Sequence, residues 1–216
     1  MTVHDSVVPN IALADFIASL ADNKQFLGRR YAEWCTSAPS LESAVAAAAM
    51  AQDEIGHARS LYPMLADISG DSPENEPETR THFTHAQFLN TQFTSWTEFV
   101  SANFLFDTAL SVGLEAAFES IHVGLAQRAR RILEEEKLHW LYAEGWLRRL
   151  SSRGGAVQQD LQERLVIITP FAMAWFDLAT LELVEDGILS RGSEDLRARF
   201  RLRVNPLLDV AGLHPL

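Results

Sequence analysis

The sequence predicts an all-α fold, a four-helix bundle with additional helices at its C-terminal end. Apolar residues recur every three or four positions over long segments, and short breaks of proline, glycine or serine separate those segments. Ionisable side chains interrupt the apolar stripes near the middle of the segments, where facing helices of a bundle build their sites. With 216 residues and 47% hydrophobic content the chain can form a sizeable core, so we expect a single domain over residues 1–216.

The first predicted helix runs over residues 11–37. Its apolar stripe passes through Lys24, so a lysine lies where a leucine is expected. One interpretation is that the lysine points into the core; the other is that the side chain bends outward and brings its ammonium to water. A break at Ala38-Pro39-Ser40 ends the helix, and Ser40 is a suitable N-cap for the next one.

The second predicted helix runs over residues 41–65, antiparallel to the first because the connection is short. Glu54 and His57 fall on its apolar stripe. Burying a carboxylate or an imidazole without a partner is costly, so other parts of the chain must satisfy both side chains. Residues 66–95, acidic at first and aromatic later, are predicted to form a long crossover.

The third predicted helix opens at the capping-box pattern Ser95–Glu98. Asp107 lies on its inward stripe, and we expect Phe118 and Ile121 to continue that stripe. Gly124 then separates the third helix from the fourth.

The fourth predicted helix runs over residues 126–151, and Glu136 and His139 lie on its inward stripe. Arg153-Gly154-Gly155 stops it. A further pair of the same spacing, Glu119 with His122, lies at the end of the third helix and off its stripe, so we interpret that pair as a chance occurrence.

Additional helices are expected after the bundle. Residues 156–183 are largely apolar and predict one or two helices, with a break or kink at Pro170. Residues 196–204 alternate apolar residues with arginine, which is strand periodicity. We nevertheless expect a helix there, because Ser193 and the acidic residues after it resemble a helix start and a lone strand would have no partner.

Composition excludes several classes of protein. The net charge of -11 argues against nucleic acid or an anionic membrane as the main partner. No apolar run is long enough to cross a bilayer, and the N-terminus has no signal-peptide pattern. Cys35 is the only cysteine, so no internal disulfide is expected. These features together predict a cytoplasmic protein.

The interrupting side chains form a pattern that is typical of a metal centre. Two helices each offer a Glu-x-x-His pair, and a third offers one carboxylate near the same level. The five candidate metal ligands are Glu54, His57, Asp107, Glu136 and His139. This is the ligand pattern of a carboxylate-bridged dinuclear site in a ferritin-like bundle, in which spacing of three lets both side chains of a pair bind one ion.

The charge count favours one ion over two. The first helix offers Lys24 where the pattern requires a carboxylate, and two divalent ions plus an ammonium would exceed the charge of three carboxylates. One ion of iron or another divalent metal would balance, as would a metal-free salt-bridge cluster with protonated histidines. Asp53 and Glu135 are placed to hold the histidines of the facing helices, with an exposed position as the alternative.

Several segments along the chain together carry a family resemblance. They are Leu20-Ala21-Asp22-Asn23, Glu33-Trp34-Cys35 with Ala38-Pro39, Asp53-Glu54-Ile55-Gly56-His57-Ala58-Arg59, Glu144-Gly145-Trp146-Leu147 and Glu185-Asp186-Gly187. By these segments the chain resembles, over most of its length, the ferritin-like subunits of bacterial phenylacetyl-CoA epoxidase. In that family one subunit holds a di-iron centre and epoxidises the aromatic ring of the CoA thioester, while a related subunit has lost the ligands and serves as its scaffold.

The resemblance implies features of both subunits. The five candidate ligands match ligand positions of the catalytic subunit, and Lys24 occupies the position of its first glutamate. The Glu33-Trp34-Cys35 and Glu144-Gly145-Trp146 segments are more similar to the scaffold subunit. The resemblance implies, as partners, other subunits of an oxygenase complex and a CoA thioester substrate; a homo-oligomer is the alternative.

Three functions follow as hypotheses. The first is a subunit of a phenylacetyl-CoA epoxidase type monooxygenase in phenylacetate degradation, with a metal site that is partly degenerate at Lys24. The second is a non-catalytic partner subunit that binds no metal. The third is a stand-alone ferritin-like metal oxidase.

Overall fold

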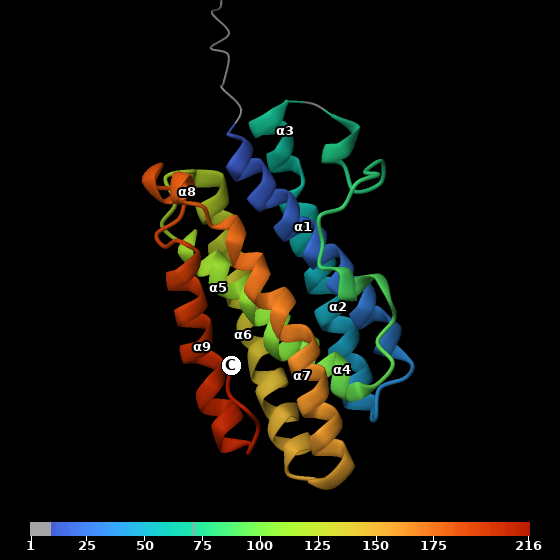
Figure 1. Ribbon diagram of the computed structural model, residues 1–216. Coiled ribbons are helices and arrows are strands. Elements are labelled where there is room, and N and C mark those ends of the chain that lie inside the picture. Colours follow the sequence, from blue (N-terminus) through green and yellow to red (C-terminus); the bar gives the residue numbers. More distant parts are fainter. Residues whose placement is uncertain (1–9, 71) are drawn as a thin grey trace, which may run out of the picture.

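Four long helical rods form a bundle in the computed structural model, which describes residues 10–70 and 72–216 (Figure 1). No strand occurs in these residues. The rods are α1 (Ile11–Ala32), α2 (Leu41–Leu61), a composite rod of α4 (Trp96–Ser101), η4 (Ala102–Asp107) and α5 (Thr108–Ala116), and α6 (Val123–Ser151). The predicted all-α, ferritin-like four-helix bundle is confirmed.

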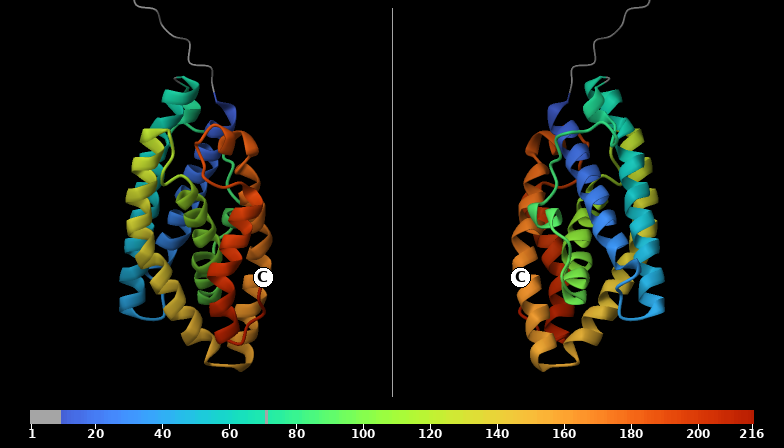
Figure 2. Two further views of the ribbon diagram at one scale, coloured as in Figure 1. Left: turned by 90° about the vertical axis from the view of Figure 1, so that its left-hand side faces the viewer. Right: turned by 90° about the vertical axis from the view of Figure 1, so that its right-hand side faces the viewer.

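Two further helices cover the bundle on one side. α7 (Gly155–Trp175) packs along the composite rod, and α9 (Ser193–Val210) packs against α5, with the short helix α8 (Leu181–Glu185) between them (Figure 1). The other side of the bundle is formed by α2 and α6, which lie side by side (Figure 2). None of the helices in the described ranges has the length and apolar character that a bilayer crossing requires.

The predicted N-caps at Ser40 and Ser95 are confirmed. Ser40 Oγ accepts a hydrogen bond from the backbone N–H of Ser43, and Ser95 Oγ accepts one from that of Glu98. These caps satisfy donors that the first turn of a helix leaves without partners. They therefore fix where α2 and the composite rod begin, and with that the level of the side chains further along each rod.

Two predicted helix ends were wrong. The first helix was expected to reach residue 37, but α1 ends at Ala32 and a short 3-10 turn, η1 (Glu33–Cys35), follows. The second helix was expected to continue to residue 65. Instead Pro63 begins a separate helix, α3 (Pro63–Ser69), because proline has no N–H to continue the hydrogen bonding of α2 and suits a first helical turn.

The crossover between the second and third rods is tied to α1 by a buried carboxylate. It contains two 3-10 turns, η2 (Pro73–Asn75) and η3 (Gln87–Asn90). Asp22 is fully buried, and its Oδ2 accepts hydrogen bonds from Arg80 Nη2 at 3.0 Å and from the backbone N–H of Thr84 at 2.7 Å. This network holds a long connection along the bundle and satisfies a charge that would otherwise be unpaired in the core.

The junction of the third and fourth rods differs from the prediction. α5 ends at Ala116, so Phe118 and Ile121 do not continue the inward stripe and are 43% and 71% exposed. α6 begins at Val123 and includes Gly124, because His122 caps it through a hydrogen bond from Leu125 N–H to His122 Nδ1. His122 thus has a capping role, which agrees with our interpretation that the Glu119 and His122 pair is not part of the site.

The C-terminal helices test two predictions. Of the two alternatives at Pro170, a break is wrong because α7 continues through it, and a kink stays a prediction. A proline removes the bond to the carbonyl four residues earlier, and that residue, Val166, is 59% exposed, so its carbonyl lies on the side of the helix that water reaches. Residues 196–204 belong to α9, and its buried Leu196, Phe200 and Val204 follow the helical period.

Candidate metal centre in the bundle core

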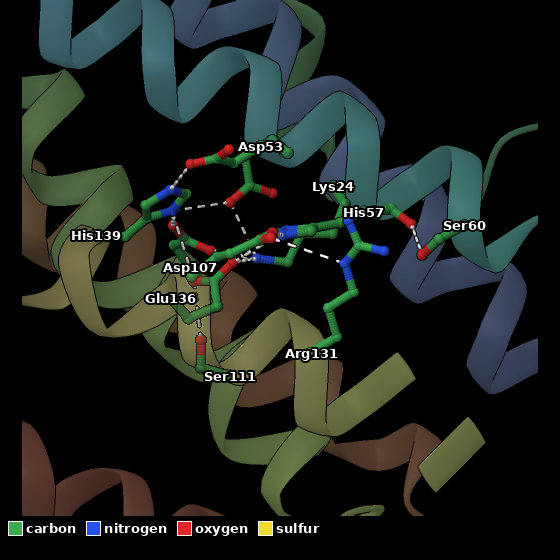
Figure 3. Close-up of polar contacts among 11 residues, drawn as sticks. Lys24, Asp53, His57, Ser60, Asp107, Ser111, Arg131, Glu136 and His139 are labelled. Atoms are coloured by element: carbon green, nitrogen blue, oxygen red, sulfur yellow. Dashed lines mark hydrogen bonds and ion pairs between the residues drawn. The ribbon is translucent and has the colours of Figure 1, made fainter. Parts of the chain in front are cut away.

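Lys24 lies in the middle of the polar cluster, surrounded by carboxylates from the other three rods (Figure 3). Its side chain is fully buried. The Nζ atom donates hydrogen bonds to Glu54 Oε1 at 3.0 Å, to Asp107 Oδ1 at 2.6 Å and to Glu136 Oε1 at 2.5 Å. The alternative in which Lys24 reaches outward to water is therefore wrong.

The ammonium of Lys24 is stable in the core because its neighbours outweigh the cost of burial. Burial by itself lowers the pKa of a lysine, but the charges of Asp107, Glu136 and Glu54 raise the pKa of Lys24 well above its ordinary value. Each of its three ammonium hydrogens has a charged acceptor, which is what a buried cation requires. Lys24 is thus a permanent cation of this core.

His139 forms a second group of contacts with the same carboxylates. Its Nδ1 atom lies 3.1 Å from Asp107 Oδ2, 3.3 Å from Glu54 Oε1 and 3.6 Å from Glu136 Oε2, and its Nε2 atom lies 3.4 Å from Asp53 Oδ2. Burial opposes the charged imidazole, but these carboxylates, Glu136 first, raise the pKa of His139 well above the ordinary value. The carboxylates around His139 thus favour the imidazolium form of its ring.

His57 contacts only one carboxylate of the inner group. Its Nδ1 atom lies 3.3 Å from Glu136 Oε1, and its Nε2 atom lies 2.6 Å from Glu135 Oε2. Burial opposes the charged ring here too, and the hydrogen bond with Glu136 together with nearby negative charge raises the pKa of His57 above its ordinary value. Glu135 and Asp53 thus hold the histidines of the facing helices, while about 39% of each of their side chains stays exposed.

The carboxylates of the cluster differ in their acidity. Burial and the neighbouring charge of Asp107 raise the pKa of Glu54 to about 7. Burial also acts on Glu136, but Lys24, His139 and His57 outweigh it and hold the pKa of Glu136 well below its ordinary range. Lys24 and the two histidines thus lie against the three inner carboxylates, and the raised pKa of Glu54 lowers the negative charge that these carboxylates carry near neutral pH.

The local backbone brings these side chains to one level. Asp107 ends the π-helical segment η4, whose wider turns shift the side chains that follow relative to a regular α-helix. Gly28 lets α1 approach α2 beside Glu54, because a Cβ atom at Gly28 would lie 2.7 Å from Ile55 Cγ1 and 3.1 Å from Glu54 Cβ. Both features set the separation of the rods around Lys24.

Two members of the site were missed from the sequence. Ser111, one turn after Asp107, donates a hydrogen bond from Oγ to Glu136 Oε2 at 3.1 Å. Tyr31 is fully buried, and burial and the charge of Asp107 raise its pKa well above the ordinary value. The sequence held a signal for both residues. Ser111 lies one turn after Asp107 and Tyr31 lies two turns after Lys24, each on the same inward helix face.

A pair of metal ions does not fit the observed side chains. Lys24 Nζ uses one oxygen of every inner carboxylate, and an ion placed among those oxygens would lie against an ammonium. A single ion fits better beside His139. Donor atoms of Glu54, Asp107, Glu136 and His139 lie within 4.8 Å of one another, and ligands around a tetrahedral ion are separated by about 3.4 Å.

Two cavities reach the cluster from opposite sides of α6. A cavity of about 810 Å³ lies between α2 and α6 and contacts His57, Asp53 and Glu135. A second, of about 710 Å³, is lined by residues of α5, α6 and α9 and contacts Glu136 and His139. Solvent therefore reaches His57 and the outer carboxylates from one side, and Asp107, Glu136 and His139 from the other.

Comparison with known proteins identifies relatives of the chain. The family model described as phenylacetic acid catabolic protein matches residues 6–215. One of the subunits of 1,2-phenylacetyl-CoA epoxidase from Escherichia coli strain K12 is 24% identical over 181 residues, which cover 82% of this chain and 73% of that protein. The match to the family model spans nearly the whole bundle and includes every residue of the cluster. The chain therefore belongs to the phenylacetic acid catabolic protein family.

Proposed function

We propose that this chain is a subunit of a phenylacetyl-CoA epoxidase type complex in phenylacetate degradation, and that it supports a metal-carrying subunit without activating oxygen itself. The Escherichia coli relative is one subunit of such an epoxidase, which supports membership of a complex with several subunits. The position of Lys24 Nζ among Glu54, Asp107 and Glu136 is the observation that carries the non-catalytic role.

The cluster has a structural task in this proposal. One lysine on α1 holds carboxylates from α2, from the composite rod and from α6, so a single ammonium links all four rods. In a dinuclear centre, bridging carboxylates and two ions make these links. Lys24 replaces them with hydrogen bonds that have fixed directions, which sets the register of the rods without a cofactor.

Oxygen activation by a dinuclear centre needs two ions with open coordination positions. The inner carboxylate oxygens that would bridge two ions here accept hydrogen bonds from Lys24. The aromatic CoA thioester would accordingly react on another subunit, and this chain would contribute the helical surface that holds that subunit.

A second candidate function follows from the geometry beside His139. One ion of iron or another divalent metal would be held by Glu54, Asp107, Glu136 and His139, whose donor atoms are grouped there. A bound divalent ion would supply a Lewis-acidic centre that polarises a water or a substrate oxygen. Binding requires His139 to release the proton on Nδ1, and the raised pKa of His139 opposes that release.

Metal analysis distinguishes the two roles. Purified chain is incubated anaerobically with ferrous iron, desalted and analysed for iron, beside Lys24→Glu and beside Lys137→Glu. The side chain of Lys137 is 64% exposed and pairs with Glu134, not with an inner carboxylate. We expect substoichiometric iron in the wild type and in Lys137→Glu, and an approach to two irons in Lys24→Glu, which restores the missing carboxylate.

Other outcomes decide between the hypotheses. One iron per wild-type chain, lost in His139→Gln, would favour the single-ion role. Two irons per wild-type chain with oxygen consumption would overturn the non-catalytic role. Oxidation of ferrous iron by the chain alone, without a reductase or a second subunit, would favour a stand-alone metal oxidase.

A further inference from the structure

The outer face of α2 is apolar where a solvent-facing helix normally carries charges. Between residues 41 and 56 only two exposed positions, Glu42 and Gln52, are polar. The rest are apolar or glycine, and Leu41 and Val45 are 78% and 62% exposed. The exposed apolar and glycine residues of this stretch are Leu41, Val45, Ala48, Ala49 and Gly56.

α6 continues this surface beside α2 (Figure 2). Leu138 is 70% exposed, and Gly145 lies two turns further along the helix on the same side. We define the α2/α6 face as the exposed apolar and glycine residues of α2 named above together with Leu138 and Gly145.

Two glycines on this face have no explanation within the chain. A Cβ atom at Gly28 would lie 2.7 Å from Ile55, and one at Gly113 would lie 2.3 Å from Trp175, so close packing accounts for both. A Cβ atom at Gly56 or Gly145 would meet no atom within 4 Å. Glycine destabilises a helix interior relative to alanine, and a close approach of another backbone is the usual reason to place it there. Gly56 and Gly145 therefore indicate close packing against the backbone of another protein chain.

A basic groove accompanies the apolar surface. The cavity of about 810 Å³ between α2 and α6 is lined by Arg59, Arg128 and Arg131. Its acidic residues, Asp53 and Glu135, are held by the buried histidines. The guanidinium of Arg131 lies 3.8 Å from Glu135 and its side chain is 84% exposed, and Arg59 makes no ion pair with the described residues. Three arginines against two carboxylates leave the groove with a net positive charge, on a protein whose net charge is -11.

We propose that the α2/α6 face docks a helix of a different subunit, which packs closely over Gly56 and Gly145 and places carboxylates in the arginine groove. This inference rests on the proposed membership of a multi-subunit complex. The groove decides against a second copy of this chain, since two copies paired through this face would bring two positive grooves together. A helix with an apolar stripe and flanking carboxylates complements both the apolar strip and the groove.

The glycines provide a test with opposite effects on the free chain and the complex. Gly56→Gln and Gly145→Gln place a good helix former at an open position, so the Tm of the isolated chain should rise by about 2 °C for each. The same side chains separate the two helices in the complex, so the Kd for the partner should increase at least about tenfold. Leu202→Gln is the control, because Leu202 is 77% exposed on α9, outside the face.

The groove is tested by charge reversal. Arg59→Glu combined with Arg131→Glu should slow association with the partner at low salt and reduce its salt dependence, because rim charges act mainly on the association rate. Arg201→Glu, an exposed arginine of α9, is the matched control and should leave association unchanged.

The probes are the other purified epoxidase subunits from the same organism, titrated with the full chain and followed by light scattering after size exclusion. Weaker binding by the face variants alone supports the proposal. A complex that forms equally well with the face variants overturns this inference and leaves the proposed function intact. Absence of any complex with the wild-type chain overturns both. A wild-type homodimer that Gly56→Gln disrupts would make the occupant a second copy and overturn the choice of a different subunit.

Discussion

The two halves of the buried cluster use the same carboxylates in different ways. In the Lys24 half, an ammonium lies 2.5–3.0 Å from one oxygen of each inner carboxylate and uses all of its hydrogens. In the His139 half, an imidazole nitrogen lies 3.1–3.6 Å from three carboxylate oxygens. The first half has the geometry of a completed salt bridge, whereas the second keeps the spacing of metal ligands.

In the dinuclear ligand pattern of ferritin-like bundles the first helix supplies a glutamate, and here that position is taken by Lys24. A lysine brings one positive charge and a long side chain that fills the space between the rods, so the half it enters loses both the vacancy and the negative charge that an ion needs. The other half keeps its donor atoms. Because Glu54, Asp107 and Glu136 all belong to both halves, the charge of Lys24 also weakens the binding of an ion beside His139.

Removing the ammonium of Lys24 should lower the stability of the protein more than any other change to the cluster. Lys24→Met keeps the approximate length of the side chain and leaves three buried carboxylates without their main cation, so we expect the free energy of unfolding to fall by about 3–5 kcal/mol. Urea denaturation in the presence of a chelator measures this change. Lys137→Met, at an exposed lysine, should change stability by less than about 0.5 kcal/mol.

Adding divalent metal to Lys24→Met sharpens the comparison. If the two halves are linked through shared carboxylates, an ion in the vacated half should restore part of the lost stability, since anything that binds only the folded state stabilises it. A variant as stable as the wild type without metal would contradict the central role of the lysine.

The sequence predicted the members of the site better than their arrangement. Helical spacing placed all five candidate ligands and Lys24 on inward stripes, and the structure brings them together. Their role as metal ligands stays a prediction. Counting charges in the sequence left open whether one metal ion or a salt-bridge cluster balances the carboxylates. Only the position of Lys24 Nζ relative to each oxygen shows which charges neutralise one another.

The missed features depend on contacts between distant segments. The π-helical turn η4 has no local sequence signal, since Ala102–Asp107 are all buried beneath α6 and α7 and show no helical alternation. The cap at His122 was missed because histidine is not among the preferred N-cap residues. A break was one of the two alternatives expected at Pro170, because local preference alone does not reveal that its partner carbonyl faces water.

The pH dependence of stability should also distinguish the two halves, with a smaller effect than the removal of the Lys24 ammonium. The raised pKa values of His139 and His57 mean that their stabilising contribution is complete below the ordinary histidine pKa of about 6.5 and is lost as the pH rises through the folded values. The lowered pKa of Glu136 has the opposite sign, so its contribution is present above the ordinary value and is lost as the pH falls.

His139→Gln tests this assignment. We expect a loss of about 1.5–3 kcal/mol at pH 6, where the wild-type ring is charged and hydrogen-bonded to carboxylates, and a smaller loss at alkaline pH. Denaturant unfolding at both pH values measures the two losses. An equal loss at both would mean that the imidazolium does not stabilise this half.

The smallest effects are expected at the two outer carboxylates, where the halves again differ. Glu135 Oε2 lies 2.6 Å from His57 Nε2, whereas Asp53 Oδ2 lies 3.4 Å from His139 Nε2, so Glu135 makes the better hydrogen bond. Because each side chain is about 39% exposed, water screens both pairs, and we expect Glu135→Gln to cost at most about 1 kcal/mol and Asp53→Asn less.

His57 has one inner carboxylate partner and depends more on its outer one, while His139 has three inner partners to compensate. Urea denaturation of both variants at pH 6 should therefore rank Glu135→Gln as the more damaging, and the reverse order would show that the His139 half depends on its outer partner to stay charged.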